Sequence, residues 1–283
     1  MVTVDGMTDL ADAPVAATPA DTASAEAPQF EHIRVERADQ VITITMDRAR
    51  RRNSLSEDHM RELIRGFEYA GTTDARVVVL AGDGPVFSSG HDFADLQGRD
   101  LHEVRRLLSV CTELMQTIQM TPQVVIARIH GLATAGGCQL AASCDLAIAV
   151  ESAGFALPGG KGGWFCHTPS VGVSRNISRK HLMELALTGD TIDAKTAEAW
   201  GLINYAVPDD KLDEAIADMV TRLSGGSRTA KALGKQAIYN QLDRPERDAY
   251  TYAIEVMASA SQTDHAQEGI NAFVEKRKPV WPR

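Results

Sequence analysis

Two glycine-containing segments of the sequence could stabilise negative charge on a substrate. One is Val86-Phe87-Ser88-Ser89-Gly90-His91-Asp92-Phe93, and the other runs from His130 to Gln139, with glycine at positions 131, 136 and 137. Each follows an apolar run that predicts a buried strand, and glycine lets a ligand approach the main chain. If each segment aims one free N–H at a shared point, the two form an oxyanion hole. A helix beginning near Gly136 would add the positive end of its dipole.

Other interpretations of these segments need no oxyanion hole. Strand–glycine–helix turns are common in α/β proteins and often bind nothing. The second segment has the glycine spacing of a phosphate-binding loop, but Gly137-Cys138 stands where such a loop has Lys followed by Ser or Thr. Ser89, His91 and Asp92 are the residue types of a hydrolytic triad, yet a triad is assembled in space, so neighbours in sequence do not indicate one. We reject both of these readings.

The surrounding pattern predicts an α/β core that positions the two segments. Four segments have the alternating or continuous apolar pattern of strands: 41–46, 77–80, 124–127 and 146–149. An amphipathic helix is expected to begin near Glu57, after a cap at Ser54 or Ser56, and a second covers residues 104–118. The alternation of strands and helices is typical of an α/β fold.

The sequence after about Lys211 lacks strand patterns and predicts a helical region. Four helices are expected there: 211–224, 228–242, 247–260 and 264–277. We therefore expect residues 31–210 to form the core and residues 211–283 to pack elsewhere, on another subunit. Residues 1–30 are rich in Ala, Pro, Thr and Asp and poor in large apolar groups, so they predict a disordered tail.

Composition excludes several classes of protein. The 283 residues are 44% hydrophobic and 24% charged, which suits a globular protein with a substantial core. The net charge of −9, with five acidic residues and no Lys or Arg in residues 1–30, disfavours a nucleic-acid partner. No uncharged apolar run reaches the roughly 18–20 residues that a membrane span needs.

The cysteines and the tail predict a cytoplasmic protein without a metal. The four cysteines show neither CxxC pairs nor the spacing of a zinc site, so we expect reduced thiols: Cys111, Cys138, Cys144 and Cys166. The acidic tail is unlike a signal peptide or a mitochondrial transit peptide.

Four ordered blocks over about residues 31–281 resemble the crotonase, or enoyl-CoA hydratase/isomerase, superfamily. Residues 87–93 resemble its F-x-[AS]-G-x-D-L block, and residues 131–149 its G-x-[AC]-x-G-G-G-x-E-L…CD-[LI]-x-[IV]-A block. Residues 47–55 are similar to its R-P-x-x-x-N-[AS]-L segment, and residues 268–279 match its C-terminal helix. The resemblance implies an α/β spiral of ββα repeats, followed by a helical region that forms trimers or dimers of trimers.

The resemblance also implies the substrate and its contacts. Substrates would be acyl-CoA thioesters, with coenzyme A present only as part of the substrate and no other cofactor. The backbone N–H groups of His91 and Gly136 would hold the thioester carbonyl oxygen. Further contacts with coenzyme A, carried over by position, fall on Gly90, His91, Asp92 and Phe93 and, from the tail, on Phe273 and Lys276.

This sequence departs from the family at both usual catalytic glutamates. Gln139 occupies the first position and Gly159 the second. An amide has no proton to exchange near neutral pH, and glycine has no side chain. Because each acid/base group usually contributes about 10²–10⁴ in rate, most ordinary hydratase activity should be lost.

The segment 159–169 is unlike the usual family loop and about two residues longer. Together with Gly-His-Asp at 90–92, Gly-Cys-Gln at 137–139 and Phe-Cys-x-Thr-Pro at 165–169, it resembles the subgroup called enoyl-CoA hydratase domain-containing protein 3. It supplies the candidate pocket residues Gly159, Trp164, Cys166 and His167. The imidazole of His91 and the amide of Gln139 are candidate catalytic groups. Hydration, isomerisation, decarboxylation and thioester hydrolysis stay open, and the alternative is a non-catalytic acyl-CoA-binding or regulatory protein.

Overall fold

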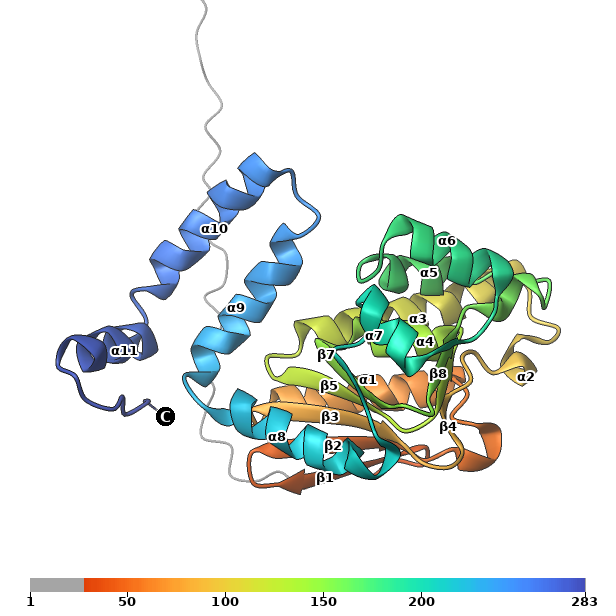
Figure 1. Ribbon diagram of the computed structural model, residues 1–283, viewed down its shortest axis with the longest axis horizontal. Helices are drawn as coiled ribbons and strands as arrows, with labels where there is room; N and C mark the ends of the chain where they lie inside the picture. Colours follow the sequence, from red (N-terminus) through yellow and green to blue (C-terminus); the bar gives the residue numbers. More distant parts are fainter. Residues whose placement is uncertain (1–27, 283) are drawn as a thin grey trace, which may run out of the picture.

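The computed structural model describes residues 28–282 (Figure 1), so most of the predicted disordered tail, residues 1–27, lies outside the described residues. The larger of two sheets has six strands in the order β1-β2-β3-β5-β7-β10, and all neighbours are parallel except β1 and β2. Its strands are β1 (Ile33–Ala38), β2 (Val41–Met46), β3 (Val77–Gly82), β5 (Val124–Ile129), β7 (Leu146–Val150) and β10 (Tyr205–Val207). All four predicted strands are confirmed.

A second, four-stranded sheet lies beside the first and was not predicted. Its order is β4-β6-β8-β9, with the first three strands parallel and β9 antiparallel to β8. The strands are very short: β4 (Val86–Ser88), β6 (Leu132–Thr134), β8 (Gly154–Ala156) and β9 (Ile192–Asp193). The chain repeatedly places one strand in each sheet and then a helix, which is a spiral of ββα units.

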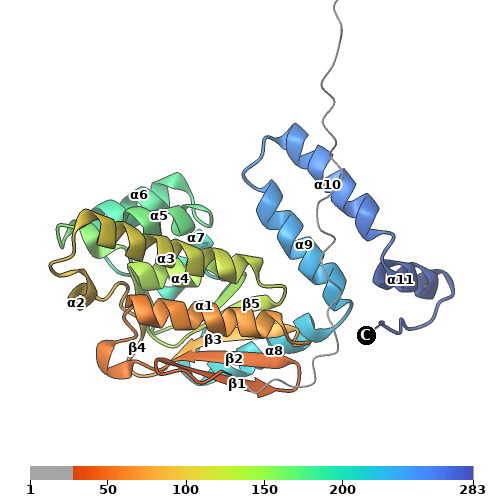
Figure 2. The same cartoon turned by 180° about the vertical axis from the view of Figure 1, so that it is seen from behind.

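Helices cover both faces of the six-stranded sheet. Figures 1 and 2 show α1 (Glu57–Gly71) against one face and α8 (Leu212–Ser224) against the other. Ser56 caps α1 by accepting from the backbone N–H of His59, as predicted. A capping box of Asp100 and Glu103 begins α3 (Leu101–Met120), which packs on α1. The remaining helices of the body are α2 (Phe93–Leu96), α4 (Gly136–Ser143), α5 (His167–Ser174), α6 (Arg179–Thr188) and α7 (Ala194–Trp200).

The C-terminal helices leave the body of the molecule. After α8 come α9 (Arg228–Gln241), α10 (Glu246–Ala260) and α11 (Asp264–Val274), in agreement with the predicted ranges except that α11 ends earlier. A buried polar cluster fixes α9 to the body: Lys235 Nζ and Tyr239 Oη lie 2.7 and 2.8 Å from the carboxylate of Asp145. Beyond it, α10 and α11 stand away from the sheets in both views (Figures 1 and 2).

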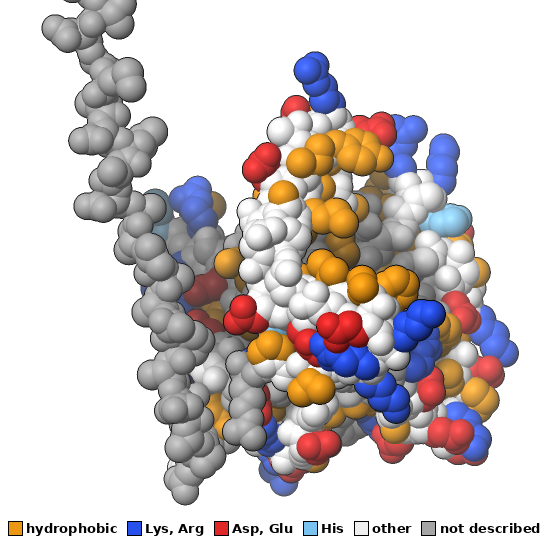
Figure 3. Space-filling model, turned by 90° about the vertical axis from the view of Figure 1, so that its left-hand side faces the viewer, with side chains coloured by type: hydrophobic (Ala, Val, Ile, Leu, Met, Phe, Trp, Pro, Cys, Tyr) orange, Lys and Arg blue, Asp and Glu red, His pale blue; other side chains and the backbone are white. Residues whose placement is uncertain are grey.

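The outlying helices expose many large apolar side chains. No residue of α10 is buried, and Ile254 and Met257 are 63% and 79% exposed. Figure 3, seen from the side of these helices, shows hydrophobic side chains gathered on this surface. Exposed apolar groups on this scale are uncommon on the surface of a monomeric protein. None of the helices among residues 28–282 is long and apolar enough to cross a membrane.

Candidate active site

The two glycine-containing segments meet because they leave neighbouring parallel strands at the same end. β4 leads into Gly90, and β6, its partner, leads into Ala135 and then α4. Gly90 has a φ of +81°, and a Cβ placed on it would lie only 2.8 Å from the backbone nitrogen of Gly136. A Cβ on Gly137 would lie 2.3 Å from the carbonyl oxygen of Ser88. Side chains at these positions would push the two segments apart.

The backbone N–H groups of His91 and Gly136 are both unpaired. The N–H of Leu55 donates to the carbonyl of Gly90 and the N–H of Asp92 donates to the carbonyl of Leu55, which leaves the N–H of His91 outside this pairing. Gly136 is the first residue of α4, whose first N–H groups have no partner inside the helix. Among residues 28–282, neither group donates to another protein atom. The structure thus brings two free donors side by side.

A cavity of about 460 Å³ lies beside this region and is lined by His91 and by Ala135, the residue before Gly136. This volume falls within the usual range for small-molecule sites. All four predicted pocket residues line it, as do His91 and Phe93, whereas Gly136 is represented in the lining only by its neighbour Ala135. The lining residues are Ser89, His91, Phe93, Leu108, Thr134, Ala135, Pro158, Gly159, Lys161, Gly162, Trp164, Phe165, Cys166, His167, Thr168 and Pro169.

The imidazole of His91 is uncharged at neutral pH. Burial lowers its pKa to about 4, because an imidazolium in this position would lose its hydration. Its Nε2 atom is shielded from solvent and has no hydrogen-bond partner in the protein. The edge of the ring meets the Trp164 ring at a centroid distance of 5.9 Å. A neutral imidazole can donate or accept a hydrogen bond but presents no positive charge to a ligand.

The two positions that hold glutamate in the resembling family offer no acid here. Gln139 is buried in α4 and does not line the cavity; its Oε1 lies 3.9 Å from the Sγ of Cys111 on α3. A Cβ added to Gly159 would lie 2.3 Å from the carbonyl oxygen of Trp164 and 2.7 Å from the nitrogen of Cys166. The structure therefore does not bring Gln139 to the other candidates, and it leaves no room for a side chain at position 159.

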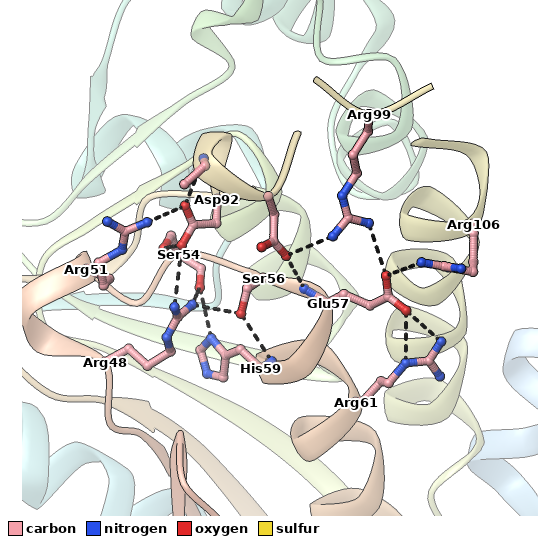
Figure 4. Close-up of polar contacts among 12 residues, drawn as sticks. Arg48, Arg51, Ser54, Ser56, Glu57, His59, Arg61, Asp92, Arg99 and Arg106 are labelled. Atoms are coloured by element: carbon pink, nitrogen blue, oxygen red, sulfur yellow. Dashed lines mark hydrogen bonds and ion pairs between the residues drawn. The ribbon is translucent and has the colours of Figure 1, made fainter. Parts of the chain in front are cut away.

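The Asp92 carboxylate lies in a polar network (Figure 4), and Asp92 does not line the cavity. Its Oδ1 accepts from Arg51 at 2.8 Å, its Oδ2 accepts from the hydroxyl of Ser54 at 2.8 Å, and Arg48 lies 3.5 Å away. Burial alone would raise its pKa, but the hydrogen bonds from Ser54 and Arg51 hold the pKa of Asp92 below its ordinary value. Asp92 therefore stays charged and fixes the segment that carries His91.

Two further side chains fix the same region, and composition or spacing did not single them out. Asn53 donates through Nδ2 to the carbonyls of Asp83, Val86 and Phe87, at 2.8 to 3.1 Å. The carboxylate of Glu57 pairs with the guanidinium groups of Arg61, Arg99 and Arg106 (Figure 4). For Asn53, the only signal in the sequence was the resemblance of residues 47–55 to a family block.

Phe273 and Lys276 do not reach this site within one chain. Neither lines the cavity, and Phe273 is 84% exposed. They lie at and just beyond the end of α11, which α9 and α10 carry away from the body, whereas α2 and α5 lie on its opposite side (Figure 1). The expected contact with coenzyme A is therefore not available from the same chain.

Comparisons with known proteins place this site in a family. Residues 36–283 match the family model for enoyl-CoA hydratase/isomerase. The chain belongs to the enoyl-CoA hydratase/isomerase family. Enoyl-CoA hydratase domain-containing protein 3 of Mus musculus is 40% identical over 247 residues, 86% of this chain and 82% of the relative. The resemblance to this subgroup, inferred from the sequence, is thereby confirmed.

Solved structures support the same conclusion for the enoyl-CoA hydratase/isomerase fold. A crystal structure of an enoyl-CoA hydratase from Mycobacterium smegmatis superposes with a TM-score of 0.86 at 38% identity, covering 89% of this chain and 99% of that one. Human enoyl-CoA hydratase domain-containing protein 3 superposes with a TM-score of 0.85 at 35% identity, covering 89% and 100%. The predicted crotonase-like α/β fold with a C-terminal helical region is confirmed.

The names of the relatives correct the expected location. The mouse, rat and human proteins of the matching subgroup are all named mitochondrial. The cytoplasmic location predicted from reduced cysteines and from the acidic composition of residues 1–30 is contradicted by this finding, and we withdraw it.

Proposed function

We propose that this family member is an enzyme that acts on acyl-CoA thioesters. The observation that carries the proposal is the pair of unpaired N–H groups, on His91 and Gly136, beside a cavity of substrate size. In this proposal both groups donate to the thioester carbonyl oxygen. When the acyl group reacts at its α- or β-carbon, that oxygen gains enolate charge, and the two donors with the N-terminus of α4 stabilise it. Coenzyme A enters only as part of the substrate.

Ordinary hydration is not the reaction that the lining favours. Among the described residues no Asp or Glu lines the cavity, so neither carboxylate of a hydratase is available to activate water or deliver a proton. The same hole could serve isomerisation, decarboxylation or thioester hydrolysis, each of which passes through an enolate or an oxyanion. The missing carboxylates equally favour a second candidate, a protein that binds acyl-CoA without turning it over.

The oxyanion hole can be tested by a substitution that removes one backbone N–H and leaves the rest of the segment in place. Proline is tolerated at the first position of a helix, so Gly136→Pro deletes the donor at the start of α4. Gly136→Ala is the matched control, because it adds a Cβ with contacts of 3.3 to 3.4 Å but keeps the N–H. Loss of one such donor should lower kcat about 10²–10³-fold in the proline variant only.

The first assay is turnover of crotonyl-CoA, followed as loss of the conjugated thioester absorbance, with a panel of other acyl-CoA esters followed by chromatography. A His91→Ala, Gln139→Ala double variant is the control for adventitious activity. If Gly136→Pro keeps the wild-type turnover, the proposed role of the Gly136 N–H in an oxyanion hole is wrong. Tight binding with no turnover of any ester would favour the binding protein.

We also propose that the protein is a homo-oligomer, a trimer or a dimer of trimers, assembled through α9 to α11. The support is the exposed apolar surface of α10 and α11, together with the absence of Phe273 from the lining of the cavity in the same chain. In such an assembly Phe273 and Lys276 would contact coenzyme A bound to a neighbour. A monomer in analytical ultracentrifugation would contradict this.

A further inference from the structure

The wall of the cavity next to Gly159 is made of main chain. A Cβ at position 159 would lie 2.3 Å from the carbonyl oxygen of Trp164, 2.7 Å from the nitrogen of Cys166 and 2.9 Å from its Sγ. Two of these three atoms belong to the backbone, which cannot turn aside as a flexible side chain can. The space at this position is therefore filled by residues 164–166, whichever side chain is placed there.

Trp164 extends this wall across the cavity. Its ring meets the rings of His91 and Phe93 edge-on, at centroid distances of 5.9 and 6.4 Å. These two residues come from the segment after β4, whereas Trp164 lies in the loop between β8 and α5. The ring therefore bridges two lining segments where the cavity meets solvent, since Trp164 is 39% and Phe93 71% exposed. Gly163, directly before it, has a φ of +81° and no atom within 4 Å of the place of a Cβ.

The lining offers no free positive charge. Lys161 Nζ is paired with the carboxylate of Asp190 at 2.5 Å. The imidazole of His91 is neutral, and burial raises the pKa of the Cys166 thiol, so that group is neutral too. The exposed ring of His167 packs against Phe165 at 5.1 Å. A carboxylate buried here would find hydrogen-bond donors but no unpaired ammonium or guanidinium group, and a buried charge without an opposite charge is costly.

We propose that Trp164 is a specificity-determining residue, which together with the backbone of residues 164–166 makes the site selective for an uncharged, apolar acyl group of limited length. This inference rests on the proposed action on acyl-CoA thioesters and narrows it. It favours isomerisation or thioester hydrolysis over decarboxylation, because a decarboxylase must first bind a carboxylated acyl group.

The test measures binding of four thioesters to the full-length protein by isothermal titration calorimetry. The probes are butanoyl-, octanoyl-, dodecanoyl- and succinyl-CoA, and the variants are Trp164→Ala and Trp164→Phe. Trp200→Ala is the matched control, because that tryptophan stacks on His181 outside the cavity. Saturable binding of the uncharged esters and none of succinyl-CoA are expected for the wild type.

Removing the Trp164 ring should change the preference of the site for the length of the acyl chain. Loss of the Trp164 ring contacts with His91 and Phe93 should shift the ratio of the dodecanoyl to octanoyl dissociation constants about tenfold toward the longer chain in Trp164→Ala. Trp164→Phe should restore most of the wild-type ratio, and Trp200→Ala should leave it unchanged. If Trp164 had a merely structural role, Trp164→Ala would weaken the binding of all the uncharged esters alike.

The outcomes separate this inference from the proposed function. If the wild type binds none of the four esters, the proposed function fails and the inference falls with it. If the uncharged esters bind but succinyl-CoA binds as tightly as butanoyl-CoA, or if Trp164→Ala leaves the length ratio unchanged, only the inference is overturned.

Discussion

The most direct consequence of the packed wall is that Gly159→Glu should not create a hydratase. The substitution places the missing acid at its position in the family, but the clash arises at the Cβ, before the carboxylate begins. Two backbone atoms at 2.3 and 2.7 Å must move by about an ångström to reach ordinary contact distances, which begin at 3.4 Å. Overpacking of this kind typically costs about 1–3 kcal/mol.

This cost can be read as a change in Tm. At roughly 2–4 °C per kcal/mol for a chain of this size, Gly159→Glu and Gly159→Ala should each lower Tm by about 2–12 °C. Gly162→Ala is the matched control in the same loop, because its Cβ would have one neighbour only, the carbonyl oxygen of Gly159 at 3.7 Å. Its Tm should stay close to that of the wild type. Differential scanning calorimetry at fixed protein concentration measures all three.

Activity provides the second part of the same prediction. Crotonyl-CoA hydration by Gly159→Glu, and by Gly159→Glu combined with Gln139→Glu, should not rise above that of the wild type. The first carboxylate would be displaced with its loop, and the second would face Cys111 rather than the cavity. The reasoning would be refuted if Gly159→Ala melted with the wild type, or if the double variant gained the 10²-fold or greater rate typical of an acid/base group.

Three further predictions concern other parts of the molecule. Burial lowers the pKa of His59 from 6.5 to about 4, so as pH falls the unfolded chain takes up a proton at His59 before the folded chain does. The free energy of unfolding should therefore fall by about 3 kcal/mol between pH 6.5 and pH 4, and His59→Asn should remove this part of the pH dependence. The four cysteines are buried and burial raises their thiol pKa values, so Ellman's reagent at pH 7 should react slowly with the native protein and rapidly, with all four thiols, in denaturant; fast labelling of the native protein would contradict this. Lys235→Met leaves Asp145 without its cation and should cost about 3–5 kcal/mol in urea unfolding, and a loss under 1 kcal/mol would show that this pair does not anchor α9.

The parts of the fold that the sequence predicted correctly are those with a strong local signal. The strand Val77–Gly82 is apolar throughout because it is buried throughout, and α1 begins where Ser56 can cap it. The small sheet was missed because β4, β6 and β8 are three residues long and exist only through pairing with one another. Strands this short have no periodicity of their own.

The candidate site was predictable in its backbone and less so in its side chains. The glycines at 90, 136 and 137 marked the loops, and at 90 and 137 only glycine allows the close approach seen there. The direction of Gln139 depends on how α4 packs against α3, and no local pattern records that. The distance of Phe273 from the cavity likewise depends on the direction in which α9 leaves the body, which is set by the Asp145 cluster far away in sequence.

The polar network around Asn53 and Asp92 determines when the chain loses the conformational entropy that orients the N–H of His91. Because these side chains hold the segment that carries His91 through hydrogen bonds to its own flanks, the loop has its shape before any ligand arrives. The loss of conformational freedom that orients its N–H occurs once, during folding, and need not recur in each cycle of binding. Substitutions of Ser54 or Arg48, which do not line the cavity, should therefore lower the affinity for acyl-CoA or the rate of turnover.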